Sequence, residues 1–151
     1  MSPARRRSNR DEVGSALVEV VWLSLLLLVP LVYLLISVFE VQRASFGVSG
    51  AARAAARAYS LAPDEASARS RAVAAAAAAL RDQGVDPDEV QVQVRCSPLP
   101  HDCLSPGSLI AVDVHHQVRL PLAPSALGGQ VPSFRVEASH TVAYGTFREA
   151  R

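Results

Sequence analysis

The sequence predicts an α+β fold in which a single N-terminal transmembrane helix extends into alanine-rich helices and is followed by a small three-stranded antiparallel sheet packed on a helix. Three observations predict it: residues 20–39 carry no charged side chain, residues 40–83 are rich in alanine, and three segments after residue 88 carry apolar residues, many of them valine, at every second position. The expected parts are a basic leader, a transmembrane helix with an extracytoplasmic helical extension, and a small extracytoplasmic domain, which span residues 1–14, 15–59 and 60–151.

Composition narrows the classes of function. Half of the 151 residues are hydrophobic, the formal net charge is +1, and all 15 basic residues are arginine. A chain this close to neutral lacks the basic face on which nucleic-acid binding depends. We therefore expect no nucleic-acid partner.

The uncharged run from Val20 to Phe39 predicts a membrane span, and the lipid bilayer is therefore an expected partner. A helix of this length is about 30 Å long, which matches the hydrocarbon thickness of a bilayer. A buried helix of a soluble core is rarely apolar on every face over such a length, so that alternative is disfavoured. Pro30 lies inside the run, and a kink there is tolerated in membranes because neighbouring groups satisfy the freed carbonyl.

The arginines that flank the span predict its orientation. Arg5, Arg6, Arg7 and Arg10 precede it, whereas Arg43 is the only arginine in the first dozen residues after it. The positive-inside rule places the N-terminus in the cytoplasm. The rest of the chain then lies outside the inner (plasma) membrane, an oxidising location that suits the two cysteines.

A cleaved secretory signal peptide is the alternative for the first forty residues. Signal-peptide cores hold about 7 to 15 apolar residues and end at a small-x-small cleavage site. Here the apolar run is longer, and the FEVQRASF segment that follows offers no convincing site at Ala44 or Phe46. A span that stays with the mature protein as a membrane anchor is therefore favoured over a secretory signal that is removed with its apolar core.

A glycine and a glutamate stand at the entrance of the span. In VGSALVEV, Glu19 follows Gly14 by five residues, and this spacing resembles a type IV prepilin signal, in which a membrane peptidase would cut between Gly14 and Ser15. Cutting would create an α-amine on Ser15, and a helix brings positions i and i+4 to one face, so Glu19 could neutralise that amine or the amine of a neighbouring subunit. The alternative is that Glu19 only interacts favourably with the positive end of the helix dipole.

Two further helical segments are expected. The helix continues out of the membrane through Glu40 to Tyr59, where small residues allow close packing against partner helices or against the chain's own outer domain. A second helix is predicted over residues 63–83, with Pro63 at the first helical position, acidic residues in the first turn and Gly84 as the stop.

Three strands are predicted by alternation, at about residues 89–95, 108–120 and 133–147. Cys96 and Cys103 bracket a proline-containing turn between the first two strands, so we expect them to face one another and form a disulfide. The expected inner-face residues are Val90, Val92, Val94, Ile110, Val112, Val114, Val118, Leu120, Phe134, Val136, Ala138, Val142 and Tyr144.

The polar residues of these strands do not predict catalysis. Asp113 and His115 share one strand face, but two ligands do not make a metal site. His116 and His140 fall on the inner face, where edge or hydrogen-bonded core histidines are expected, and His101 lies in the turn. No nucleophile motif, phosphate loop or zinc spacing occurs, so we expect no enzyme activity, no cofactor and no metal.

With these parts assembled, residues 12–60 resemble the N-terminal region of the TadE-like family, the minor pseudopilins of tight-adherence pilus systems. The resemblance rests on the Gly-Ser-Ala-Leu-Val-Glu start at Gly14 to Glu19, the span, and the arginine-and-alanine segment after it. Val20 departs from the tyrosine usual in the major pilin, and the chain is far longer than that pilin, so the bulk subunit of a filament is disfavoured.

The resemblance implies a minor pilin-like protein in the assembly or initiation of an adhesive type IV pilus or a related secretion filament. Its expected partners are pilus assembly proteins, other pilin-like subunits and a prepilin peptidase. A hypothesis from a different class is a signal-anchored extracytoplasmic protein that binds a ligand or a metal, in which the span is only a tether.

Overall fold

The computed structural model describes residues 10–88, 90–119 and 133–145. The chain forms two compact units, Met1–Ile36 and Ser37–Arg151, and the first helix contributes to both. The fold class is the expected one, because two helices precede a three-stranded antiparallel sheet.

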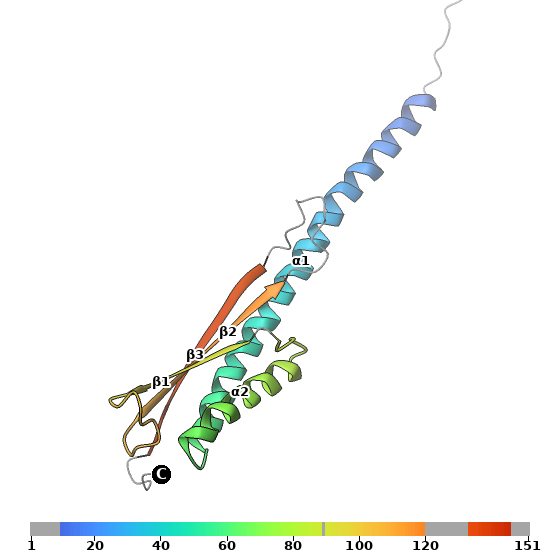
Figure 1. The fold of residues 1–151 in the computed structure, drawn as a ribbon. Coiled ribbons are helices and arrows are strands. Elements are labelled where there is room, and N and C mark those ends of the chain that lie inside the picture. The colour runs from blue at the N-terminus through green and yellow to red at the C-terminus, as the bar shows by residue number, and fades with distance from the viewer. Residues whose placement is uncertain (1–9, 89, 120–132, 146–151) are drawn as a thin grey trace, which may run out of the picture. The chain divides into compact units, whose positions relative to one another are not determined.

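Helix α1 spans Arg10–Ser60 and is 51 residues long (Figure 1). It begins inside the expected leader, five residues before the predicted start at Ser15, and ends one residue beyond the predicted end. Pro30 lies within the helix, which continues on both sides of it.

In the second unit, α1 packs through small side chains. Ala51, Ala52, Ala55 and Ala56 are buried there, at the spacing of one helix face. These alanines belong to one core cluster with residues of α2 and of the sheet. Because alanine is small, it lets these neighbouring elements approach α1 closely. The sequence allowed this segment to pack against partner helices or against the chain's own outer domain. The structure shows the second arrangement.

Helix α2, Glu65–Asp82, buries the alanine face Ala68, Ala72 and Ala76 together with Leu80. Asp64 is its N-cap, and the Asp64 carboxylate accepts a hydrogen bond from the Ser67 N–H (2.8 Å). The prediction that Pro63 takes the first helical position is therefore wrong: because the cap falls at Asp64, the proline precedes it.

The C-terminal end of α2 follows the Schellman pattern. Val85 N–H donates to the Leu80 carbonyl (2.9 Å) and Gly84 N–H donates to the Arg81 carbonyl (2.8 Å). Gly84 has a φ of +67°, a conformation that glycine adopts without a Cβ penalty. Gly84 is thus the helix stop that the sequence predicted.

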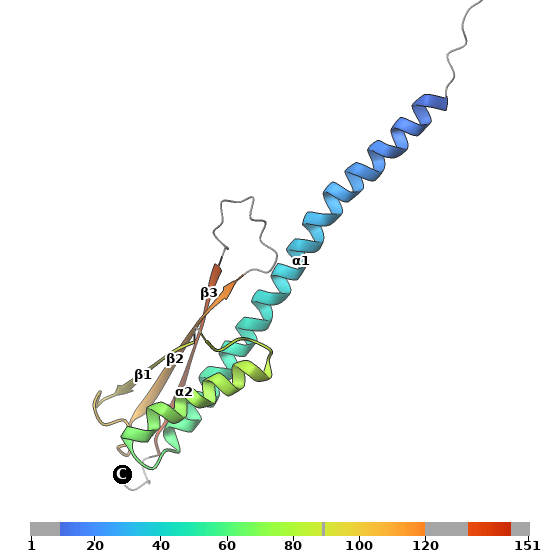
Figure 2. The ribbon, with the colours of Figure 1, turned by 45° about the vertical axis from the view of Figure 1, so that its right-hand side comes forward.

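The sheet has the order β1-β2-β3, with β1 at Gln91–Ser97, β2 at Leu109–Arg119 and β3 at Ser133–Ala143 (Figure 2). Both pairs are antiparallel. Strand β1 lies two residues later than predicted, and β3 ends at Ala143 rather than at residue 147. Residues 89, 120 and 146–147, which the predictions included, lie outside the described residues.

The inner face of the sheet carries the predicted alternation. Ile110, Val112 and Val114 are fully buried, and they share the core with the alanines of both helices. Phe134 has the same parity but is 52% exposed. Strand β1 begins opposite His115, so at Phe134 the sheet is only two strands wide and fewer side chains cover the ring.

Candidate functional site

The apolar part of α1 is the first feature with a functional meaning. Its most apolar window is long enough to cross a membrane, and none of that window is buried within the described part of the chain. Large side chains such as Trp22 and Leu26 are exposed on it. A contiguous apolar surface of this size indicates contact with lipid or with another protein. By length and composition this helix is a candidate for a membrane anchor or a signal sequence.

The residues of the predicted processing site all lie on α1. Because the helix begins at Arg10, the Gly14–Ser15 bond falls in its second turn. Glu19 is exposed, and it lies four positions after Ser15, the spacing that brings two helical residues to one face. The three leader arginines Arg5, Arg6 and Arg7 lie outside the described residues.

The predicted disulfide between Cys96 and Cys103 is present. It joins the end of β1 to the loop before β2, with the two Cα atoms 5.3 Å apart. Cys103 is buried and Cys96 is partly buried. The prediction of a bridge across this turn is thereby confirmed.

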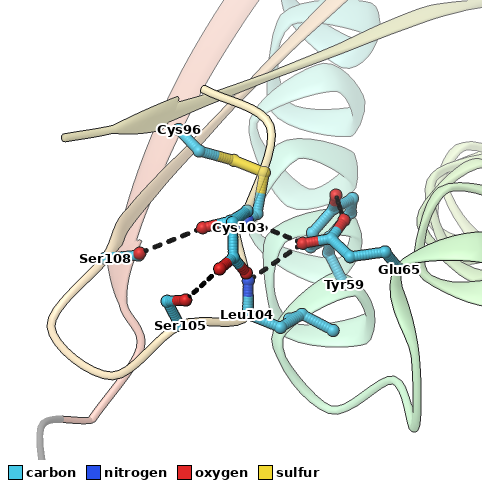
Figure 3. Close-up of a disulfide and its surroundings, with 8 residues drawn as sticks. Tyr59, Glu65, Cys96, Cys103, Leu104, Ser105 and Ser108 are labelled. Carbon is cyan, nitrogen blue, oxygen red and sulfur yellow. Dashed lines mark hydrogen bonds between the residues drawn. A yellow bond between two sulfur atoms is a disulfide. The ribbon is translucent and has the colours of Figure 1, made fainter. Parts of the chain in front are cut away.

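Glu65 connects the disulfide loop to the helices (Figure 3). Its Oε1 accepts hydrogen bonds from the backbone N–H groups of Cys103 (2.6 Å) and Leu104 (2.9 Å). Its Oε2 accepts a hydrogen bond from the Tyr59 hydroxyl (2.6 Å). One carboxylate therefore holds three donors, which come from the last turn of α1 and from a loop 38 residues further along the chain.

Tyr59 is suited to remain the donor in this cluster. Burial raises the pKa of the Tyr59 phenol, and the hydrogen bond to Glu65 raises it further. The phenol therefore keeps its proton throughout the ordinary pH range, and the Glu65 carboxylate acts as the acceptor for all three contacts.

The rest of the loop is fastened to the end of the sheet. The Ser105 hydroxyl donates to the Asp102 carboxylate, and the Ser108 hydroxyl donates to the Asp102 carbonyl (3.3 Å). Tyr144 N–H donates to the Ser108 carbonyl (2.7 Å). The loop base is thus fixed by a covalent bond, by Glu65 and by the sheet.

The outer face of the sheet is polar. Arg95 donates to Asp113 Oδ2 from Nε (2.9 Å) and from Nη2 (2.6 Å). The pKa of Asp113 is lowered: burial opposes the shift, but hydrogen bonds from Ser139 and Arg95 outweigh it. His115 Nδ1 lies 3.2 Å from the Glu137 carboxylate without hydrogen-bond geometry.

The histidines do not converge on a site. Among the described residues, no group of three or more histidine, cysteine, aspartate or glutamate side chains could hold a metal ion. His116 is buried on the inner face, but its Nδ1 has no hydrogen-bond partner, so the expectation of a hydrogen-bonded core histidine is not met at that atom. Burial lowers the pKa of His116, against an opposing effect of Asp86. His140 is partly buried, and His101 is exposed.

The sequence did not predict the role of Glu65 in holding the disulfide loop. As an acid in the first turn of a helix it is explained by the helix dipole alone, and its sequence neighbours give no sign of a distant loop. Comparisons of the chain with protein-family models, curated proteins and solved structures found no match. The residues and contacts of the chain itself therefore carry the functional proposal.

Proposed function

We propose that the chain is a minor pilin-like, TadE-like protein, anchored in the inner membrane, that acts in the assembly or initiation of a tight-adherence type IV pilus or a related secretion filament. The observation that carries the proposal is the composition of α1. Its exposed apolar segment is preceded by Gly14 and Glu19 at prepilin spacing, and the helix continues into the core of a folded domain.

The proposed orientation has the N-terminus in the cytoplasm and the second unit outside. The four arginines before the span support it through the positive-inside rule. The Cys96–Cys103 disulfide supports it as well, because disulfides persist in oxidising compartments.

In this proposal Glu19 pairs with an amine. A prepilin peptidase cuts after Gly14, and the new α-amine of Ser15 lies on the same helix face as the Glu19 carboxylate. An unpaired charge at the edge of the hydrocarbon is expensive, so the glutamate attracts either its own amine or that of an adjacent subunit. Such pairing supplies a directional contact in a region where apolar side chains alone do not select a register.

Substitution of Glu19 tests the pairing. We expect Glu19→Ala to leave membrane insertion intact, because removal of a charge only eases partitioning, and to reduce co-purification with pilus components severalfold. Glu19→Asp keeps the charge but shortens the reach, so it should retain part of the co-purification. The measurement is quantitative membrane fractionation followed by affinity capture from detergent extracts.

The matched control is Leu17→Ala, which changes a neighbouring exposed residue of α1 without touching a charge. This variant should behave as the parent. If Glu19→Ala is captured with its partners as well as the parent at equal membrane levels, the glutamate interacts only with the helix dipole and the assembly role assigned to it is wrong.

A further inference from the structure

The sheet has two free edges within the described part of the chain. Strands β1 and β3 each pair only with the central strand β2 (Figure 2). Natural proteins protect long edges with lysine, proline or bulges, because an unpaired edge is a template for another strand. Strand β3 is 11 residues long and contains neither lysine nor proline. It carries the charged side chains of Arg135 and Glu137 instead, so a strand that pairs with this edge has to offer complementary charge.

The hydrogen-bonding direction of each edge follows from the register. Tyr144 N–H bonds to the Ser108 carbonyl, one position beyond the Leu109↔Ala143 pair. Because bonded and non-bonded pairs alternate in antiparallel ladders, the even residues of β3 bond to β2 and the odd residues direct their N–H and C=O groups to the free edge. The same alternation across β2 leaves the even residues of β1 directed to the other free edge.

These two edges match each other in a parallel pairing. Both strands run antiparallel to β2, so β3 of one copy and β1 of another are parallel when the sheet continues with its inner face on one side. In a parallel pair, a residue whose backbone N–H and C=O point toward the partner strand lies opposite a residue whose N–H and C=O point away from it. The odd residues of β3 would thus lie opposite the odd residues of β1, with outer faces aligned.

Charge selects one register among those that satisfy this parity. If Glu137 lies opposite Arg95, an anion meets a cation, and the inner-face pairs become Val136 with Val94 and Ala138 with Cys96. Both charged side chains are available, since those of Arg95 and Glu137 are 72% and 67% exposed. Arg95 uses only Nε and Nη2 on Asp113, so the remaining donors of the planar guanidinium can reach a second carboxylate.

We propose that this chain associates with further copies of itself by parallel pairing of the β3 edge of one copy with the β1 edge of the next, with Glu137 opposite Arg95. The interface is heterologous, so it generates a row or a ring rather than a closed dimer. Parallel pairing keeps every copy in the same direction, which is compatible with anchors that enter one bilayer from one side. The association requires neither cleavage after Gly14 nor a pilus partner.

Cysteine cross-linking in the full-length chain, in its native membrane, tests the pairing. The proposed register places Gln93 of one copy opposite Arg135 of the next, so the variant Gln93→Cys with Arg135→Cys should give a ladder of dimers, trimers and larger species with a short bifunctional maleimide. Within one copy, Gln93 is in line with Asp113 and Ser139. Arg135 lies four residues along β3 from Ser139, and Ser139 lies two strand spacings across the sheet from Gln93. Positions 93 and 135 of one chain are therefore about 16 Å apart, which is too far for the reagent to bridge.

Three controls keep the result interpretable. Each single cysteine variant should remain monomeric, because like edges do not meet. Glu137→Lys in the double-cysteine background should weaken the ladder severalfold by facing Arg95 with a like charge. Thr141→Lys, on the same strand and face but beyond the overlap, should leave the ladder unchanged. Intact mass under non-reducing conditions verifies that the Cys96–Cys103 bridge is kept.

A double-cysteine variant that stays monomeric in the membrane overturns the proposal. So does an Arg135→Cys single variant that cross-links as strongly as the double variant, since that result means two β3 edges meet. Leader processing and capture of pilus components are measured separately, so a failure here leaves the proposed function standing and a failure there leaves the pairing standing.

Discussion

The two parts of α1 follow opposite rules of side-chain choice. In the first unit the helix carries large apolar residues that are exposed, such as Leu26 at 71%. In the second unit it carries alanines, and Ala51, Ala55 and Ala56 are fully buried. Small side chains in the second unit let neighbouring elements approach α1 closely. The large exposed side chains in the first unit leave an apolar surface that indicates contact with lipid or with another protein.

The largest expected effect comes from truncating a buried residue of the second unit. Ile110→Ala should lower the free energy of unfolding by about 2 to 5 kcal/mol, because a fully buried side chain leaves a cavity. The matched change in the first unit, Leu26→Ala, should alter it by less than about 0.5 kcal/mol. Urea unfolding of the full chain in detergent, followed by circular dichroism, measures both. Equal losses in the two variants would contradict the division of α1 into two environments.

The next effect concerns the carboxylate that ties the loop to the helices. Glu65→Ala should cost about 1 to 3 kcal/mol, because it leaves the N–H groups of Cys103 and Leu104 and the Tyr59 hydroxyl without their acceptor. It should also speed reduction of the Cys96–Cys103 bridge by dithiothreitol.

The control for that change is Glu40→Ala, which removes an acid from an exposed ion pair with Arg43. Exposed ion pairs contribute about 1 kcal/mol or less, so this variant should change stability little. A Glu65→Ala protein as stable as the Glu40→Ala protein, with an unchanged reduction rate, would show that the loop is held by the disulfide alone.

The smallest expected effect is a pH dependence confined to the second unit. Burial lowers the pKa of folded His116, so as the pH falls through about 6.5 the unfolded chain takes up a proton that the folded chain resists. The stability present above that pH is therefore lost on acidification. His116→Gln should flatten the slope of unfolding free energy below about pH 6.5, whereas His101→Gln, at an exposed loop position, should keep it. An unchanged slope in His116→Gln rules out this histidine as the cause.

Local sequence patterns predicted the parts of the fold that depend on neighbours in sequence. The parity of Ile110, Val112 and Val114 predicted the inner face, and Gly84 predicted the end of α2, because each depends on period-two alternation or on glycine at positive φ. The Cys96–Cys103 bridge was also predicted, since the two cysteines flank one turn.

Contacts between distant segments were not predictable in this way. Glu65 meets the N–H of Cys103 only because α2 and the disulfide loop come together in space, and no local pattern records that meeting. The exposure of Phe134 likewise depends on where β1 begins, opposite His115, which alternation in β3 does not encode. The position of Pro63 before the cap was missed because Asp64 competes with it as the start of α2.

Intact-mass measurement of the protein isolated from its native membrane tests the proposal that the apolar segment of α1 is a processed pilin-like anchor. The expected mass is that of a chain that lacks residues 1–14 and begins at Ser15, and Gly14→Leu should retain the leader whereas Val13→Leu should lose it. A mass that corresponds to a chain beginning at Met1 would contradict processing. A mass that corresponds to a chain beginning after Phe39 would identify a cleaved secretory signal and would contradict the membrane anchor itself.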